Sequence, residues 1–153
     1  PDRHAALVAA FLRHYAREPA LRTTLYPGVS AALDRIEASG AVLGLCTNKP
    51  EGPARDVLAA FGLTARFPVV VGGDTLPVKK PDPAPLAHVI AALGATEVLY
   101  VGDSEVDAAT ARAAGVPFAL YTQGYRKSPV DVIPHQTAFD HFDALLPVPH
   151  TAA

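Results

Sequence analysis

The chain has 153 residues, and its 13 Lys and Arg against 15 Asp and Glu give a formal net charge of −2. Half of the residues are hydrophobic and 18% are charged, so the chain can bury a core and does not have the composition of a disordered protein. The near-neutral charge argues against a general nucleic-acid or polybasic membrane partner, and a single cysteine excludes an internal disulfide and suits the reducing cytoplasm.

The chain begins at Pro1 and contains no methionine, and its first residues already read as the middle of a helix. We therefore expect it to be part of a longer protein. Its apolar runs are far too short to cross a membrane, and no basic segment followed by an apolar one resembles a targeting signal.

The first part of the chain reads as two helices. His4–Arg17 carries a single apolar stripe at helical spacing, and Val29–Ile36 is a second amphipathic segment that stops at Gly40. The intervening Tyr26-Pro27-Gly28 is typical of a chain break. Residues 1–25 therefore stand apart, as helical material outside the alternation that follows.

From Ala41 onward, short apolar runs alternate with helical segments. A continuous apolar run that is too short for a helix fits a strand buried on both faces of a parallel sheet. The predicted strands are Ala41–Cys46, Phe67–Val71, Glu97–Val101 and Val116–Tyr121. Helical segments that end at glycines lie between them, and their order βαβαβαβ predicts an α/β fold, a Rossmann-like open parallel sheet with helices on both faces. In the tail we expect a short strand near Val130–Ile133 and a helix near Ala138–Leu146.

Polar residues follow three of the predicted strands, at the sheet edge where open α/β folds bind ligands. They are Thr47-Asn48, Lys79-Lys80-Pro81 and the segment from Gly102 through Asp103 to Asp107. Two carboxylates four residues apart across a tight turn repel each other unless a cation is near, and such hard oxygen ligands suit Mg²⁺. Hydroxyl and amide donors, a lysine and a Mg²⁺ site together suit a phosphoryl group.

Each of these motifs also has an ordinary structural explanation. Thr-Asn and Gly-Asp-Ser are common at helix starts, and the pair Lys79-Lys80 can be a solvated surface pair. The order of all three motifs, each after its own strand, favours a functional site. Cys46 is expected to lie in the core, Asp74 to cap or orient the Lys80 loop, and the six histidines show no metal-ligand spacing.

Three longer segments then resemble a known family. They are LGLCTNKP (Leu43–Pro50), VVVGGDTLPVKKPDPAPL (Val69–Leu86) and VLYVGDSEVDAATARAAGVP (Val98–Pro117), with further likeness in YTQGY and in the tail to Pro147. Together they resemble the haloacid dehalogenase (HAD) superfamily of phosphatases, closest to its phosphoglycolate phosphatase group. The resemblance implies a HAD-like core over residues 26–149 that lacks its first strand, and a remnant of a helical cap over residues 1–25.

The resemblance also implies roles for individual residues. Thr47 would bind the transferring phosphoryl group, and Asn48 would help to shape that site. Lys80, directly before the proline, would steady the nucleophile and the phosphate charge. Asp103 would be a Mg²⁺ ligand, with Asp107 as its partner, either as a second ligand or as an acceptor behind it.

One family motif is absent from the chain. The HAD family places an Asp-x-Asp pair on its first strand, where the first Asp becomes an aspartyl-phosphate and the second is the general acid/base, and no such pair occurs here. We therefore expect a Mg²⁺-dependent phosphatase of a small phosphate monoester, best guess 2-phosphoglycolate, whose nucleophile lies in a missing N-terminal segment. The 153 residues alone are expected to be inactive and poorly stable.

Several alternatives remain at this point. The protein could be another HAD hydrolase, such as a sugar-phosphate phosphatase, a phosphonatase or a phosphoglucomutase-like enzyme. It could instead be a non-catalytic HAD-fold module that lost its nucleophile. A receiver-like signalling domain also pairs Asp, Thr and Lys at strand ends, but no phosphoacceptor is evident here.

Overall fold

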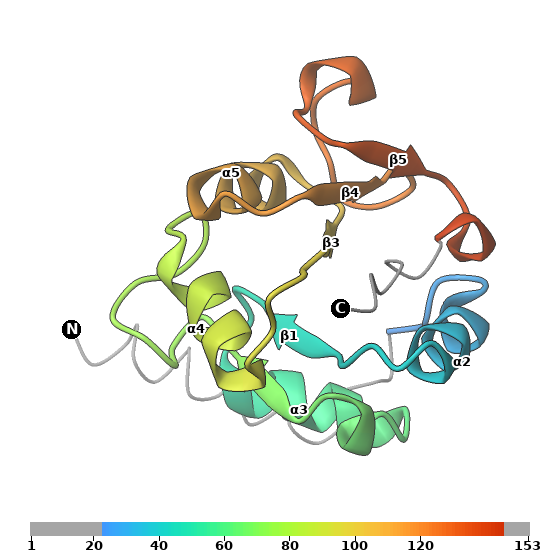
Figure 1. Ribbon diagram of the computed structural model, residues 1–153, viewed down its shortest axis with the longest axis vertical. Helices are drawn as coiled ribbons and strands as arrows, with labels where there is room; N and C mark the ends of the chain where they lie inside the picture. Colours follow the sequence, from blue (N-terminus) through green and yellow to red (C-terminus); the bar gives the residue numbers. More distant parts are fainter. Residues whose placement is uncertain (1–22, 146–153) are drawn as a thin grey trace, which may run out of the picture.

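The computed structural model describes residues 23–145, which form short parallel strands and the helices that cover them (Figure 1). The helices are α2 (Val29–Ala38), α3 (Glu51–Ala60), α4 (Ala84–Leu93) and α5 (Glu105–Ala114), with single 3-10 turns η1 (Thr64–Arg66), η2 (Val130–Val132) and η3 (Phe142–Ala144). The strands are β1 (Gly44–Cys46), β2 (Val69–Val71), β3 (Tyr100–Gly102), β4 (Phe118–Tyr121) and β5 (Thr137–Phe139). The helix expected at His4–Arg17 and the cap remnant over residues 1–25 fall almost wholly outside the described residues. No described helix has the length and apolar character that crossing a membrane requires.

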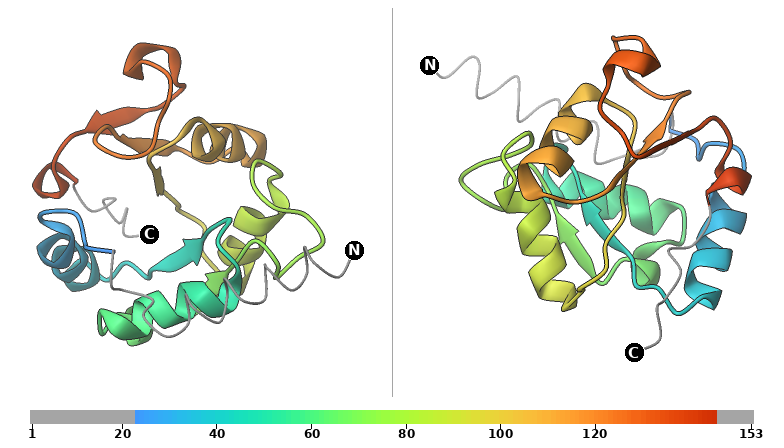
Figure 2. Two further views of the ribbon diagram at one scale, coloured as in Figure 1. Left: turned by 180° about the vertical axis from the view of Figure 1, so that it is seen from behind. Right: turned by 45° about the horizontal axis from the view of Figure 1, so that its top comes forward.

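Every strand pair is parallel, as predicted. β1 pairs with β2, and β3, β4 and β5 form a second sheet with β4 in the middle. The two views in Figure 2 show helices on both sides of the strands, so the predicted α/β fold is confirmed. Within residues 23–145, however, the sheet is interrupted, because β1 and β3 are not paired with each other.

Side chains that alternate along the strands pack against different helices. Val71 and Leu120 join the core cluster that includes the inner faces of α4 and α5. Val70 points the other way, toward Leu33 of α2 and Leu58 of α3. β2 and β4 are covered on both faces, which is why they read in the sequence as continuous apolar runs rather than as an alternating pattern.

The tail differs from its predicted structure. The expected strand near Val130–Ile133 is the 3-10 turn η2, and the helix predicted over Ala138–Leu146 is wrong, because strand β5 and turn η3 occupy that part of the chain. β5 lies along β4, with Thr137 opposite Ala119 and Phe139 opposite Tyr121. Pairing with the edge of β4 outweighs the local helical pattern, since strand formation depends on neighbouring strands more than on intrinsic preference.

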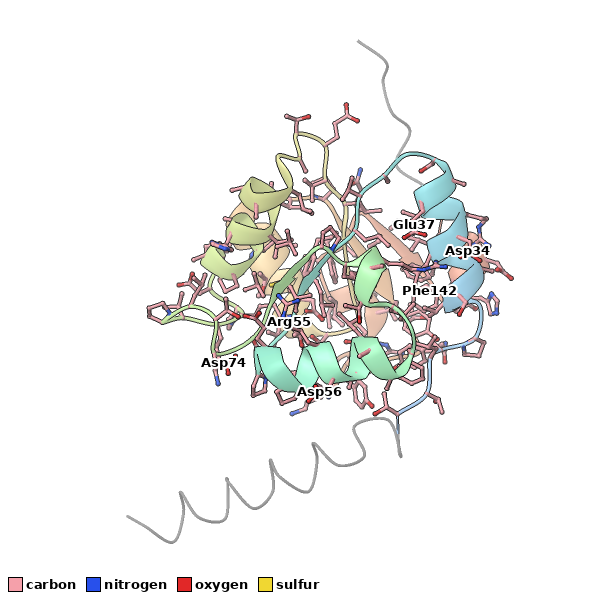
Figure 3. The ribbon with its side chains drawn as sticks, turned by 90° about the horizontal axis from the view of Figure 1, so that it is seen from below. Asp34, Glu37, Arg55, Asp56, Asp74 and Phe142 are labelled. Carbon is pink, nitrogen blue, oxygen red and sulfur yellow. The ribbon has the colours of Figure 1, made fainter. Side chains whose placement is uncertain are left out.

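Two arginines tie α2 to its surroundings. Arg35 donates from its guanidinium to the carbonyl oxygen of Phe142 in η3 at 2.9 Å, and Arg66 after α3 contacts Asp34 at 2.6 Å. Figure 3 shows Phe142 beside Asp34 and Glu37 of α2. The contacts anchor α2 to the tail on one side and to the β1–β2 half of the fold on the other.

Gly44 in β1 supplies a test of the packing between β1 and α4. A Cβ added there would lie 2.4 Å from Val89 Cγ1 and 2.9 Å from Leu93 Cδ1, both on α4. We expect Gly44→Ala to lower the free energy of unfolding by about 1–3 kcal/mol through overpacking. Gly52→Ala on α3, where an added Cβ meets no atom within 4 Å, is the control and is expected to leave stability equal or slightly higher. Urea denaturation of the full-length gene product measures both, and equal midpoints would contradict the packing argument.

Candidate active site

The hydroxyl of Thr47 lies at the carboxyl end of β1. The backbone N–H of Thr47 donates to the carbonyl oxygen of Val71 at 2.9 Å, which continues the pairing with β2 beyond the strand. Its Oγ1 accepts from the backbone N–H of Lys49 at 3.1 Å. Because the side-chain oxygen accepts this bond, its O–H proton can be donated to a bound anion.

The ammonium group of Lys80, in the loop between β2 and α4, is the centre of the site. It donates to the carbonyl oxygen of Cys46 at 3.0 Å, to the hydroxyl of Tyr100 at 2.9 Å and to Asp107 Oδ1 at 2.7 Å. The Lys80 and Asp107 side chains are only 10% and 8% exposed. Three acceptors satisfy all three ammonium donors, which is what an ion pair out of water requires.

Both carboxylate oxygens of Asp107 are engaged by protein donors. Oδ1 accepts from Lys80 and from Tyr100, and Oδ2 accepts from the Ser104 hydroxyl at 2.7 Å and from the backbone N–H of Asp103 at 3.1 Å. Burial by itself would raise the pKa of Asp107, but the charge and hydrogen bond of Lys80, with the Ser104 bond, outweigh it and hold the pKa below its usual range. Asp107 is therefore a fixed negative charge beneath the site.

Asp103 lies half-buried at the same edge, directly after β3. Its Oδ2 accepts from the backbone N–H of Tyr125 at 3.1 Å. Burial, helped by the neighbouring Asp107 carboxylate, raises the pKa of Asp103 above its usual range. A carboxylate whose charged form is disfavoured in this way gains from a nearby cation. Among residues 23–145, no cluster of three or more His, Cys, Asp and Glu side chains is placed to hold a metal ion.

Asn48 and Asp74 make contacts that the sequence did not indicate. The amide Nδ2 of Asn48 donates to the carbonyl oxygen of Lys80 at 3.0 Å, so Asn48 links the loop after β1 to the loop before α4. Asp74 was expected to cap or orient the Lys80 loop. It bonds instead to the start of α3, where its Oδ1 accepts from the backbone N–H of Glu51 at 2.7 Å.

Tyr100 is a site residue that sequence reasoning missed. It stands inside an apolar run, where a tyrosine reads as an ordinary core residue. Its buried hydroxyl bonds to both Lys80 and Asp107, and burial followed by the Asp107 charge raises the pKa of Tyr100, so the hydroxyl keeps its proton. No local pattern could have found it, because its partners lie seven and 20 residues away along the chain.

A cavity of about 480 Å³ lies between β1 and β3, and its lining includes Cys46 and Tyr100, which both accept hydrogen bonds from Lys80. It is lined mainly by apolar side chains, and two of them, Val42 and Val101, are 64% and 36% exposed. The facing edges of β1 and β3 pair with no strand among the described residues. We call this cavity the β1–β3 slot.

The sequence matches a known family over most of its length. Residues 2–121 match the family model for haloacid dehalogenase-like hydrolases. The chain belongs to this family. The resemblance inferred from the three motifs is therefore confirmed.

Several members of this family are similar to this chain in sequence or in structure. A phosphoglycolate phosphatase of Cereibacter sphaeroides is 54% identical over 147 residues, which cover 95% of this chain and 67% of the relative. That of Rhodospirillum rubrum is 49% identical over 92% of this chain and 59% of the relative. The crystal structure of a predicted phosphoglycolate phosphatase from Haemophilus somnus has a TM-score of 0.81 and 33% identity, over 86% of this chain and 60% of that one. The chain thus spans about two thirds or less of the length of these relatives.

The carboxylate of Glu105 supplies a pH test of the loop that holds Asp103. It accepts from its own backbone N–H and from those of Ser128 and Lys127, and these bonds lower its pKa from 4.5 to about 2. Because the pKa of Glu105 is lower in the folded state than in the unfolded state, its contribution to stability is fully present above about pH 4.5. That contribution is lost as the pH falls toward 2. We expect Glu105→Gln to flatten the fall of the melting temperature between these two pH values.

The matched control is Asp56→Asn on the exposed face of α3 (Figure 3). It is expected to leave the slope of melting temperature against pH close to that of the wild type. Thermal scans of the full-length gene product at steps of pH make the measurement. A Glu105→Gln profile that runs parallel to the wild type would show that the loop contacts do not contribute.

Proposed function

We propose that this protein is a Mg²⁺-dependent phosphatase of small phosphate monoesters, with 2-phosphoglycolate as its leading substrate. The observation that carries the proposal is the contact between Lys80 and Asp107, which draws three polar loops to one edge of the fold. The names of the relatives support the substrate, since those of Cereibacter sphaeroides and Rhodospirillum rubrum are phosphoglycolate phosphatases.

The described residues can bind and polarise a phosphoryl group. Thr47 donates its hydroxyl proton to one phosphoryl oxygen, and the ammonium of Lys80 provides positive charge beside it. Phosphoryl transfer asks the protein mainly for positioning and for stabilisation of charge on the oxygens. A fixed donor and a lysine clamped by three acceptors meet that demand, because neither has to reorganise during the reaction.

Asp103 is the residue that would hold Mg²⁺. Its carboxylate is a hard oxygen ligand, and its raised pKa fits a place where a cation is wanted. When bound, Mg²⁺ supplies positive charge that offsets the charge of the phosphate. Of the two roles considered for Asp107, a second Mg²⁺ ligand or an acceptor behind Asp103, we assign the second, because protein donors already occupy both of its carboxylate oxygens. It orients Lys80 and the backbone of Asp103 from below.

We further propose that the nucleophile comes from a strand outside this chain that occupies the β1–β3 slot. Within residues 23–145, the facing edges of β1 and β3 have no strand partner and the slot's apolar walls are exposed. Both features favour one more parallel strand, which would pair with both edges and cover Val42 and Val101. An aspartate at the carboxyl end of that strand would emerge beside Lys80 and attack the phosphorus, which breaks the bond to the ester oxygen. The general acid/base expected in the same segment would give that oxygen a proton, so that it leaves as the alcohol. Water then hydrolyses the aspartyl-phosphate.

The first test is activity of the full-length gene product. We expect it to hydrolyse 2-phosphoglycolate with Mg²⁺ faster than sugar phosphates or phosphonates, and to lose this activity in EDTA. Lys80→Ala should lower kcat by about 100-fold or more, since it removes a charge that stabilises the transition state. Lys79→Ala, at the neighbouring exposed lysine, is the control and should retain wild-type rates. Equal rates for the two variants would refute the assignment of Lys80.

The metal assignment has its own test. We expect Asp103→Asn to raise the Mg²⁺ concentration needed for half-maximal activity, because the amide offers a weaker oxygen ligand than the carboxylate. Titration of activity against Mg²⁺ measures the shift. An unchanged Mg²⁺ dependence with a folded variant would mean that Asp103 does not bind the metal.

The slot makes a prediction for the 153-residue chain by itself. We expect the purified chain, with its intact mass confirmed, to show no phosphatase activity, because it lacks the nucleophile. We also expect a low melting temperature, because the apolar walls of the slot are exposed. The assay is the one above at matched concentration. Hydrolysis of a phosphate ester by this chain alone would show that the nucleophile lies within residues 1–153.

A further inference from the structure

We propose that Gly72–Thr75, the loop after β2, is a clasp that positions the turn Thr47–Pro50 for phosphate binding. The inference rests on the proposed function and deepens it, because it assigns positioning residues to the phosphate site. Their hydrogen bonds go to the turn, to Glu51 at the start of α3 and to one another.

The backbones of the two loops touch each other. A Cβ added to Gly73 would lie 2.3 Å from the carbonyl oxygen of Asn48 and 2.9 Å from its carbonyl carbon. A Cβ added to Gly72 would lie 2.2 Å from the backbone nitrogen of Glu51 and 2.5 Å from its Cα. Backbone atoms cannot rotate away as the end of a side chain can, so a side chain at Gly73 would displace the turn and one at Gly72 would displace the start of α3.

Hydrogen bonds hold the turn from the same side. The backbone N–H of Gly73 donates to the carbonyl oxygen of Lys49 at 2.8 Å, and Asp74 Oδ1 accepts from the backbone N–H of Glu51 at 2.7 Å. Figure 3 shows Asp74 beside the first turn of α3. One bond is made to the peptide group before Pro50 and the other to the peptide group after it, so the end of the turn is restrained on both sides of this proline.

Thr75 stabilises the clasp itself. Its hydroxyl accepts from the backbone N–H of Gly72 at 2.8 Å and donates to Glu51 Oε2 at 2.7 Å. The other oxygen of Glu51 accepts from Arg55 at 2.8 Å. Glu51 is thereby held at its backbone and at both carboxylate oxygens, and the start of α3 becomes a rigid support for the turn.

Two further hydrogen bonds hold the beginning of the turn. Thr47 is bonded to β2 through Val71, and the side chain of Asn48 is bonded to the carbonyl of Lys80. Together with the bonds from the clasp, these contacts restrain the turn along its whole length and so fix where the Thr47 hydroxyl points. Small displacements matter here, because catalysis depends steeply on the placement of groups around the reacting atoms.

The test uses four variants of the full-length gene product, Gly73→Ala, Asp74→Ala, Asp74→Asn and the control Gly52→Ala. Gly52 is exposed on α3, and an added Cβ there meets no atom within 4 Å. The measurements are kcat, KM, the inhibition constant of inorganic phosphate and the melting temperature. The inhibition constant reports on the phosphate site, which a purely structural role would leave unchanged in a folded variant.

We expect Gly73→Ala to raise the inhibition constant of phosphate by roughly 10- to 100-fold, as a displaced turn should, with Gly52→Ala unchanged. Asp74→Ala should raise it by a smaller factor. Asp74→Asn keeps an oxygen that can accept from Glu51 and should restore the wild-type value. If Gly73→Ala does not fold, the Asp74 pair gives the same answer.

Two results would overturn the inference while leaving the proposed function intact. One is an active wild type in which folded Gly73→Ala and Gly52→Ala have the same inhibition constant. The other is an Asp74→Ala variant with the wild-type inhibition constant, or an Asp74→Asn variant that is impaired as much as Asp74→Ala. A wild-type gene product without phosphatase activity would instead overturn the proposed function, and the clasp with it.

Discussion

The buried contact between the Lys80 ammonium and the Asp107 carboxylate holds this protein's candidate site together. It joins the loop before α4 to the first turn of α5, and the remaining Lys80 donors reach Cys46 in β1 and Tyr100 in β3. Removing one partner of such a pair leaves an unpaired charge out of water, which costs about 3–5 kcal/mol. Since β1 and β3 are not paired with each other, the same lysine also links the two sheets.

The loops around this contact are positioned by backbone geometry as much as by side-chain chemistry. Gly72 and Gly73 allow the loop after β2 to touch the turn after β1, and Gly102 lies against the Asp107 carboxylate, where a Cβ would approach within 2.5 Å of its side chain. Three polar loops from separate strands can therefore lie against one another. The chemistry proposed for Thr47 and Asp103 depends on these close approaches.

The residues that the sequence proposed for the site lie at one edge of the fold, yet their partners were only partly foreseeable. Each motif residue follows its own strand, at the strand ends where open α/β folds bind ligands. β1 and β3 are not paired with each other, so it is Lys80, bonded to Cys46 of β1 and Tyr100 of β3, that links the strand ends followed by Thr47 and Asp103. The hydroxyl of Tyr100 and the contact from Asp74 to Glu51 could not be read from local patterns, because a strand tyrosine and a loop aspartate have many possible partners. The β1–β3 slot is likewise a property of two strands that lie far apart in the chain.

The sequence by itself determined the order of helices and strands between Val29 and Tyr121 and the family, because apolar periodicity, glycine stops and motif spacing are local properties of the chain. It misassigned the tail, where β5 forms only because β4 offers an edge for pairing. Only the tertiary structure decided which donors surround Asp107, which loop clasps the phosphate-binding turn and where the sheet is interrupted. These features depend on contacts between distant residues, and their distances are set by the packing of the whole domain.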